Sequence, residues 1–187
     1  MKEGVRSIGI DDGPFARDSK GDVLVVGAVF KGGTWFDGLL STKVRKDGWN
    51  ATDRLVSMLC ASKFIRQLHY VILDGIAFGG FNVVDLDRLN KETGLKIMVS
   101  MRKMPDMRAV KKAVMNLSRW KSRWKMILSA GRIYPVGGIF CQLRGMDENE
   151  ALELLKLTTT RSNLPEPLRA AHLIAGGLVR GQSGKRA

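Results

Sequence analysis

Residues 22–45 read DVLVVGAVFKGGTWFDGLLSTKVR, two stretches of strand-forming residues on either side of Gly32-Gly33. The apolar run VLVVGAVF is typical of a buried strand, and a glycine pair between two such stretches favours an antiparallel hairpin. The preceding residues 4–11, GVRSIGID, form another short apolar run that ends in an acid. The N-terminal part of the chain therefore predicts an antiparallel meander of strands 4–11, 22–31 and 34–45.

The rest of the chain alternates between helical and strand patterns. Apolar spacing and end residues predict helices over 50–68, 85–93, 105–128, 147–157 and from Asn163 to Gly176-Gly177. Strands are predicted at Tyr70–Leu73 and Leu95–Ser100, with a hairpin over 133–145. This order predicts the α/β class: a mixed five-stranded sheet, three antiparallel strands and then parallel strands, flanked by helices. We expect one domain over 1–180 and a disordered basic tail over 181–187.

The composition is strongly basic, with 31 Lys+Arg against 18 Asp+Glu and a net charge of +13 over 187 residues. Such an excess attracts polyanions, and nucleic acid is the obvious partner. The longest uncharged apolar run, Val23–Phe30, is far shorter than the ~20 residues of a membrane span. We therefore expect no membrane association and place the protein in the cytoplasm. Two cysteines provide neither a zinc ribbon nor a disulfide framework.

The basic residues concentrate in one segment, Arg102–Lys125, whose only acid is Asp106 and which also holds Trp120 and Trp124. Basic residues interleaved with aromatic residues suit phosphate neutralisation with stacking. The same pattern also fits a solvated helix whose tryptophans pack inward. On the first interpretation, the residues that follow a nucleic-acid backbone are Lys111, Lys112, Arg119 and Arg123.

Two carboxylates follow predicted strands. Asp11 shares a strand face with the small residues Ser7 and Gly9, and Asp74 is the only charged residue between Val71 and Phe81. Carboxylates at the ends of adjacent strands suit Mg²⁺, which prefers oxygen ligands. Asp53, at the start of the first helix, is a candidate third ligand, with Asp47 as a substitute. Each acid also has a structural interpretation, because Asp11 and Asp74 precede turn residues and Asp53 favours a helix N-terminus.

Three motifs, GIDDGPF (9–15), VILDG (71–75) and LPEPLRAAHLIAGG (164–177), resemble the archaeal endonuclease dU family, which is similar to endonuclease V. The resemblance extends over nearly the whole chain in element order. It implies a ribonuclease H-like fold and Mg²⁺- or Mn²⁺-dependent cleavage of a phosphodiester near a deaminated base, with deoxyuridine-type lesions in DNA favoured over RNA.

The resemblance also assigns roles to individual residues. Asp11 and Asp74 match metal-binding carboxylates, Asp53 matches a helix-borne acid only approximately, and Lys103 falls near a lysine expected to touch phosphate. His172 stands where a further acid would complete the carboxylate set. Because neutral histidine binds Mg²⁺ poorly, we expect His172 to orient water, contact phosphate or shuttle a proton.

Some alternatives stay open. Exposed aromatic residues among Trp35, Phe36 and Trp49 are candidates to wedge beside an extruded base, although core packing suits each of them too. A non-catalytic nucleic-acid-binding protein that retains the nuclease fold is the main alternative function, because the carboxylate set is incomplete. A basic scaffold that docks on an acidic protein is another.

Overall fold

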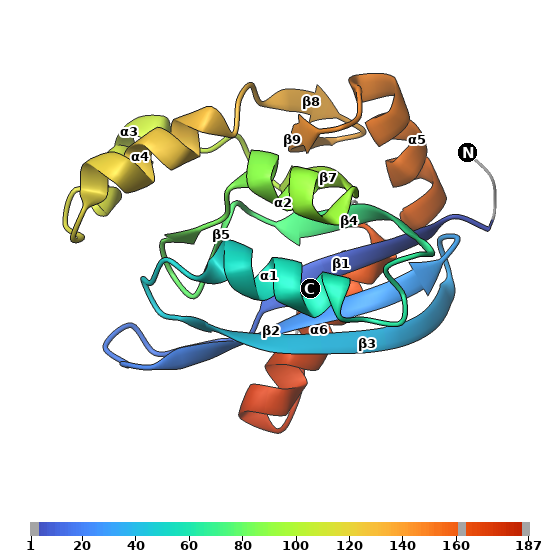
Figure 1. The fold of residues 1–187 in the computed structure, drawn as a ribbon, viewed down its shortest axis with the longest axis horizontal. Helices are drawn as coiled ribbons and strands as arrows, with labels where there is room; N and C mark the ends of the chain where they lie inside the picture. Colours follow the sequence, from blue (N-terminus) through green and yellow to red (C-terminus); the bar gives the residue numbers. More distant parts are fainter. Residues whose placement is uncertain (1–3, 161–163, 185–187) are drawn as a thin grey trace.

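A computed structural model describes residues 4–160 and 164–184. Its centre is a seven-stranded sheet in the order β3-β2-β1-β4-β7-β9-β8 (Figure 1). The strands are β1 (Arg6–Asp12), β2 (Asp22–Lys31), β3 (Trp35–Arg45), β4 (Leu68–Asp74), β7 (Lys96–Met101), β8 (Tyr134–Val136) and β9 (Ile139–Arg144). A separate small ladder joins β5 (Ala77–Phe78) to β6 (Asn82–Val83).

The pairing confirms the predicted mixed α/β sheet. β1 pairs antiparallel with β2 and parallel with β4, and β4 pairs parallel with β7. The sheet has seven strands rather than five because the predicted hairpin, β8–β9, joins it through antiparallel pairing of β9 with β7. The parallel pair β1–β4 has a functional consequence, since the carboxyl ends of the two strands lie side by side at one edge.

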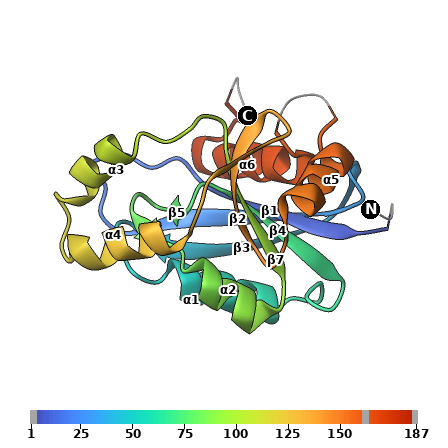
Figure 2. The same cartoon turned by 90° about the horizontal axis from the view of Figure 1, so that it is seen from above.

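Six helices were found in the described part of the chain: α1 (Ala51–Cys60), α2 (Leu86–Thr93), α3 (Met107–Val114), α4 (Trp120–Ser129), α5 (Glu148–Thr158) and α6 (Glu166–Arg180). Figure 2 shows α5 and α6 on one face of the sheet and α1 and α2 on the other. α3 and α4 pack on each other beyond one end of the sheet. None of these helices is long and apolar enough to cross a bilayer.

Alternation along β1 separates the two faces of the sheet. Ile8 and Ile10 are fully buried in the cluster that contains Leu55 of α1 and Leu89 of α2. The intervening Gly9 faces α6, where a Cβ atom would lie 2.2 Å from the backbone nitrogen of Leu168. The absence of a side chain at Gly9 therefore lets the first turn of α6 rest directly on β1.

The basic segment is two helices rather than one. α3 ends at Val114 and α4 begins at Trp120, with Arg119 in the left-handed region at φ 53°. Asn116 and Ser118 between them are weak helix formers, which explains the interruption. The first helix is also shorter than predicted, because regular α-helix stops at Cys60 and turns follow.

The C-terminal helix is longer than predicted. α6 continues through Gly176-Gly177 to Arg180 and ends at Gly181, whose φ of 77° provides a left-handed cap. The predicted N-terminal residue Asn163 lies outside the described residues, and Pro165 occupies the N-cap. Of the predicted tail, residues 181–184 are described and 185–187 lie outside the described residues.

Candidate metal centre and nucleic-acid interface

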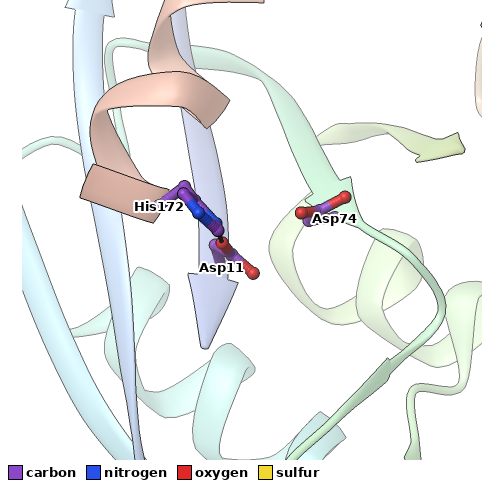
Figure 3. Close-up of side chains that lie close together, drawn as sticks. All are labelled: Asp11, Asp74 and His172. Carbon is purple, nitrogen blue, oxygen red and sulfur yellow. Dashed lines mark hydrogen bonds and ion pairs between the residues drawn. The ribbon is translucent and has the colours of Figure 1, made fainter. Parts of the chain in front are cut away.

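Asp11, Asp74 and His172 meet at the carboxyl ends of β1 and β4. Ile10 pairs with Leu73 in the parallel register, so the two aspartates that follow these residues emerge from neighbouring strand ends. Figure 3 shows His172 of α6 directly above Asp11 of β1, with Asp74 beside them at the end of β4. One ligand atom from each of the three residues lies within 4.8 Å of the others. The structure thus brings together three of the four residues predicted to be catalytic.

Two periodicities place His172 above Asp11. Asp11 lies two residues beyond Gly9 on the same strand face, and His172 lies one helical turn beyond Leu168. The close approach of Gly9 to Leu168 therefore also positions His172 next to Asp11. The distance from His172 Nδ1 to Asp11 Oδ2 is 2.7 Å, and the Asp12 backbone N–H donates to Asp11 Oδ1 at 2.8 Å.

The carboxylates of this cluster are poorly solvated. Asp11 is only 5% exposed, and burial, followed by repulsion from Asp74, raises its pKa to about 7 despite the hydrogen bond to His172. Burial also raises the pKa of Asp74, opposed by the positive charges of Arg102 and His172. Neighbouring carboxyl groups whose pKa values are raised by burial are common at functional sites, and a cation between them would favour their ionised forms.

The cluster opens into a pocket of about 410 Å³, whose walls include the exposed residues Phe15 and Arg180. Asp12 also lines this pocket, although strand alternation directs its carboxylate to accept a hydrogen bond from the Gly79 backbone N–H. Repulsion from Asp74 contributes to the raised pKa of Asp12, after burial. Sequence reasoning missed Asp12, Arg180 and Arg102 as parts of the site.

The donor set fits a hard divalent cation. The pocket has three carboxylates from Asp11, Asp12 and Asp74, and oxygen is the preferred ligand of Mg²⁺ and Mn²⁺. Ser100, which pairs with Asp74 in the sheet, adds a buried hydroxyl without a hydrogen-bond partner in the described part of the chain. A cation between Asp11 and Asp74 would offset the repulsion from Asp74 that, after burial, contributes to the raised pKa of Asp11.

Asp53 does not join this cluster. Its Oδ1 atom is 2.6 Å from Arg88 Nη1, and its side chain is 56% exposed on the α1–α2 side of the sheet. The prediction of Asp53 as a third ligand relied on the start of a helix, where an acid is favourable for electrostatic reasons alone. The ion pair of Asp53 with Arg88, at the start of α1, favours a structural role for Asp53 over a role as a metal ligand.

The predicted nucleic-acid contacts divide into exposed and buried residues. Lys103, Lys111, Lys112 and Arg119 are exposed on the segment that contains α3 and α4. Arg123 is 1% exposed, and its guanidinium donates to the backbone carbonyls of Gly48, Phe81 and Asp47. Arg123 ties α4 to two loops, so its assignment to a nucleic-acid surface is corrected to a structural role.

The three candidate wedge residues lie at different ends of the sheet. Trp35 pairs with Lys31, which pairs in turn with Arg6 at the start of β1, far from Asp11. Phe36 belongs to the same end. Trp49 instead stacks against Arg119 and Arg123, with guanidinium-to-ring distances of 5.6 and 4.3 Å. Only Trp49 of the three therefore lies beside the basic helices.

Similar proteins were found in archaea. The UPF0215 protein of Methanothermobacter thermautotrophicus is 48% identical, covering 98% of this chain and 92% of that relative. The UPF0215 protein of Pyrococcus furiosus is 36% identical, and the match covers 99% of this chain and 97% of that relative. The crystal structure of an Archaeoglobus fulgidus protein of unknown function has a TM-score of 0.87 at 39% identity, covering 94% and 98%.

More distant structural likeness defines the fold. Endonuclease V of Streptomyces avermitilis superposes with a TM-score of 0.60 at 14% identity, covering 96% of this chain and 83% of that chain. Endonuclease V of Ciona intestinalis superposes with a TM-score of 0.56 at 13% identity, covering 89% of this chain and 82% of that chain. These values show the ribonuclease H-like fold of endonuclease V, as the sequence motifs implied.

The family model described as endonuclease dU matches residues 3–179, almost the whole chain. Together with the structural likeness to endonuclease V, this match supports a nuclease. The chain belongs to the endonuclease dU family.

Proposed function

We propose that this protein is a Mg²⁺- or Mn²⁺-dependent endonuclease that cleaves a DNA phosphodiester near a deaminated base, deoxyuridine above all. The observation that carries the proposal is the convergence of Asp11, Asp74 and His172 in an open pocket. The family supports the choice of lesion. The Ciona intestinalis relative in fold was crystallised with a 24mer DNA containing an inosine, which supports nucleic acid with a deaminated base as the substrate class.

The ligand residues on this proposal are Asp11 and Asp74, with Asp12 at the rim. A divalent cation held there supplies Lewis-acid stabilisation of charge on the phosphoryl oxygens and lowers the pKa of bound water. Asp11 and Asp74 would hold the cation between them, because β1 and β4 place the two carboxylates in neighbouring strand ends. Asp53 is left out of the proposed ligands, since it pairs with Arg88.

His172 and two arginines, Arg180 and Arg102, have separate roles. The Asp11 carboxylate holds the Nδ1 side of the imidazole, so Nε2 is the ring nitrogen left to exchange a proton with water or with the leaving oxygen. Arg180 at the pocket wall, and Arg102 near Asp74, provide positive charge for the phosphates on either side of the cut. Lys103, just beyond β7, lies at the same edge of the sheet.

The test uses oligonucleotides that carry uracil, hypoxanthine or no lesion, in single-stranded and duplex DNA and in RNA. We expect cleavage of the uracil-containing DNA with Mn²⁺ or Mg²⁺, none after EDTA, and none with Asp74→Asn. Binding that weakens with salt, but without product under either ion, would instead favour a non-catalytic nucleic-acid-binding protein. Equal cleavage of all substrates would retain the nuclease and reject its lesion specificity.

The exposed face of α3 predicts a measurable salt dependence. Lys112→Ala is expected to make the plot of log association constant for DNA against log salt concentration less steep by about 1, because one phosphate contact is lost. Affinity should fall equally for DNA with and without a lesion, because a phosphate contact carries no base information. Fluorescence anisotropy in EDTA at several salt concentrations measures both quantities. Lys91→Ala, an exposed lysine on α2, is the control and should leave the slope unchanged.

A further inference from the structure

A second pocket lies under the basic helices, a short distance along the chain from the carboxylates. It has a volume of about 240 Å³ and an almost entirely apolar lining from the sheet end, α3 and α4, including Ile76, Phe81, Met101, Met107 and Ile127. Ile76 follows Asp74 by two residues, and Met101 follows Ser100, the β7 partner of Asp74. The pocket therefore lies near the same strand ends as the candidate metal centre, but toward the α1–α2 face of the sheet, where Ile76 and Met101 pack, and it is covered by helices with exposed lysines.

Gln142 is the one polar side chain in the described lining of this pocket. It lies on β9, is 6% exposed, and its Nε2 atom donates to the Gly131 carbonyl at 3.0 Å. This hydrogen bond requires the amide nitrogen on the Gly131 side, so the orientation of the amide is fixed. No described residue donates to Oε1, and Oε1 is not among the buried unpaired atoms. A fixed acceptor oxygen therefore opens into an apolar cavity.

An acceptor in an apolar cavity selects for a ligand that brings a donor. If the ligand places an acceptor atom against Oε1, no hydrogen bond forms and the two atoms repel each other. If the ligand places an N–H group there, Oε1 accepts a hydrogen bond. The volume is suitable for one heterocycle, because a cavity of about 150 Å³ already holds benzene. Apolar walls with one placed polar group are the usual composition of a specific small-ligand site.

We propose that this pocket receives the extruded base and that Gln142 Oε1 accepts a hydrogen bond from its ring N–H. Deamination changes the relevant group: cytosine and adenine present a ring nitrogen lone pair, whereas uracil and hypoxanthine present an N–H beside a carbonyl. With Gln142 Oε1 aligned on the ring nitrogen, and not on the exocyclic amino group, the contact favours a deaminated base over its parent. The proposal rests on the proposed function for the identity of the ligand, and it adds a specificity-determining residue outside the metal centre.

Thymine and guanine also carry a ring N–H, so Gln142 does not exclude them. Their protection comes from base pairing, because a base in a stable pair costs more to extrude than a mispaired or unpaired one. Gln142 therefore discriminates against cytosine and adenine, whereas the cost of extrusion discriminates against paired thymine and guanine. An experiment on Gln142 must remove the contribution of pairing.

The test places uracil, cytosine or N3-methyluracil opposite an abasic residue in one duplex, so that none has a pairing partner. N3-methyluracil keeps both carbonyls of uracil and has a methyl group in place of the N–H donor. Wild-type protein in EDTA is expected to bind the uracil duplex at least about tenfold more tightly than either competitor, the range that one unsatisfied buried polar group produces. Cleavage rates with Mn²⁺ should show the same order.

Gln142→Met removes the amide at nearly constant volume and is expected to bring the uracil-to-cytosine ratio to within about threefold of unity. Asn90→Leu is the control, because Asn90 Nδ2 also donates to a backbone carbonyl, that of Leu95, outside the pocket. It should leave the ratio unchanged. If Gln142→Met lowers the melting temperature but keeps the wild-type ratio, Gln142 is only structural and the inference is overturned.

Binding and cleavage separate the two hypotheses. Base-selective binding without any product would retain the role of Gln142 and reject the nuclease. Cleavage that does not distinguish uracil from cytosine or N3-methyluracil would retain the nuclease and reject the role of Gln142. Equal binding of the three duplexes by the wild-type protein would also reject it.

Discussion

Asp11→Asn is expected to lower Mn²⁺-dependent cleavage by about a thousandfold or more while raising the thermal stability of the metal-free protein at pH 8. The loss of activity follows because one anionic ligand of the cation disappears, and electrostatic stabilisation by a metal amounts to several kcal/mol, with a factor of ten for each ~1.4 kcal/mol. The gain in stability follows from burial. The wild-type protein must hold an ionised, desolvated carboxylate beside Asp74, whereas the amide is neutral.

The pH dependence has a definite sign. Folding raises the pKa of Asp11 from 3.8 to about 7, so the folded state binds a proton that the unfolded state has already released. The stability contribution of Asp11 is therefore present below about pH 4 and is lost as the pH rises toward 7. Its total size is about 2–4 kcal/mol, which corresponds to roughly 5–10 °C in melting temperature at this chain length.

Calorimetry or circular dichroism melts in EDTA between pH 4 and 8 measure this effect. The wild-type melting temperature should decline over this range relative to that of Asp11→Asn. Mn²⁺ in place of EDTA should raise the melting temperature of the wild-type protein and of Asp53→Asn but not of Asp11→Asn. Asp53→Asn is the matched control, because Asp53 is exposed beside Arg88, and its cleavage rate should stay within about threefold of the wild-type rate. Full cleavage by Asp11→Asn, or none by Asp53→Asn, would contradict the assigned cluster.

Gly9→Ala is expected to destabilise the protein by about 3 kcal/mol or more, at the upper end of overpacking effects. The added Cβ would lie 2.2 Å from the Leu168 backbone nitrogen and the Pro167 carbonyl carbon. No rotamer change relieves a contact with backbone, so the start of α6 must move away from β1. The melting temperature should fall by about 6–12 °C.

Activity should fall further than stability alone explains, because the same helix carries His172. Displacement of α6 lengthens the 2.7 Å contact between His172 Nδ1 and Asp11 Oδ2. Cleavage at 20 °C, where Gly9→Ala remains folded, isolates this effect. Gly4→Ala is the control, since no atom lies within 4 Å of a Cβ at Gly4. Wild-type stability and activity in Gly9→Ala would show that α6 does not depend on this close approach.

Much of the fold was predictable because its main features are local. The apolar runs and the glycine pair predicted the β1–β3 meander, and the acids in the last residues of β1 and β4 marked the two strand ends that meet. Asp74 was identifiable because a lone charge in an apolar stretch needs a partner. The number of strands was underestimated, since nothing local to residues 133–145 shows whether a hairpin stands alone or extends a sheet.

The sequence by itself determined the α/β class, the family motifs, the excess of positive charge and the positions of Asp11, Asp74 and His172 along the chain. Only the tertiary structure decided which charged residues are free to act. Arg123 and Lys112 look alike in a basic segment, yet one is enclosed by backbone carbonyls and the other faces solvent. Strand and helix patterns can be recognised from residues that are close in the sequence. The burial of a side chain, in contrast, depends on segments that are brought together from distant parts of the chain.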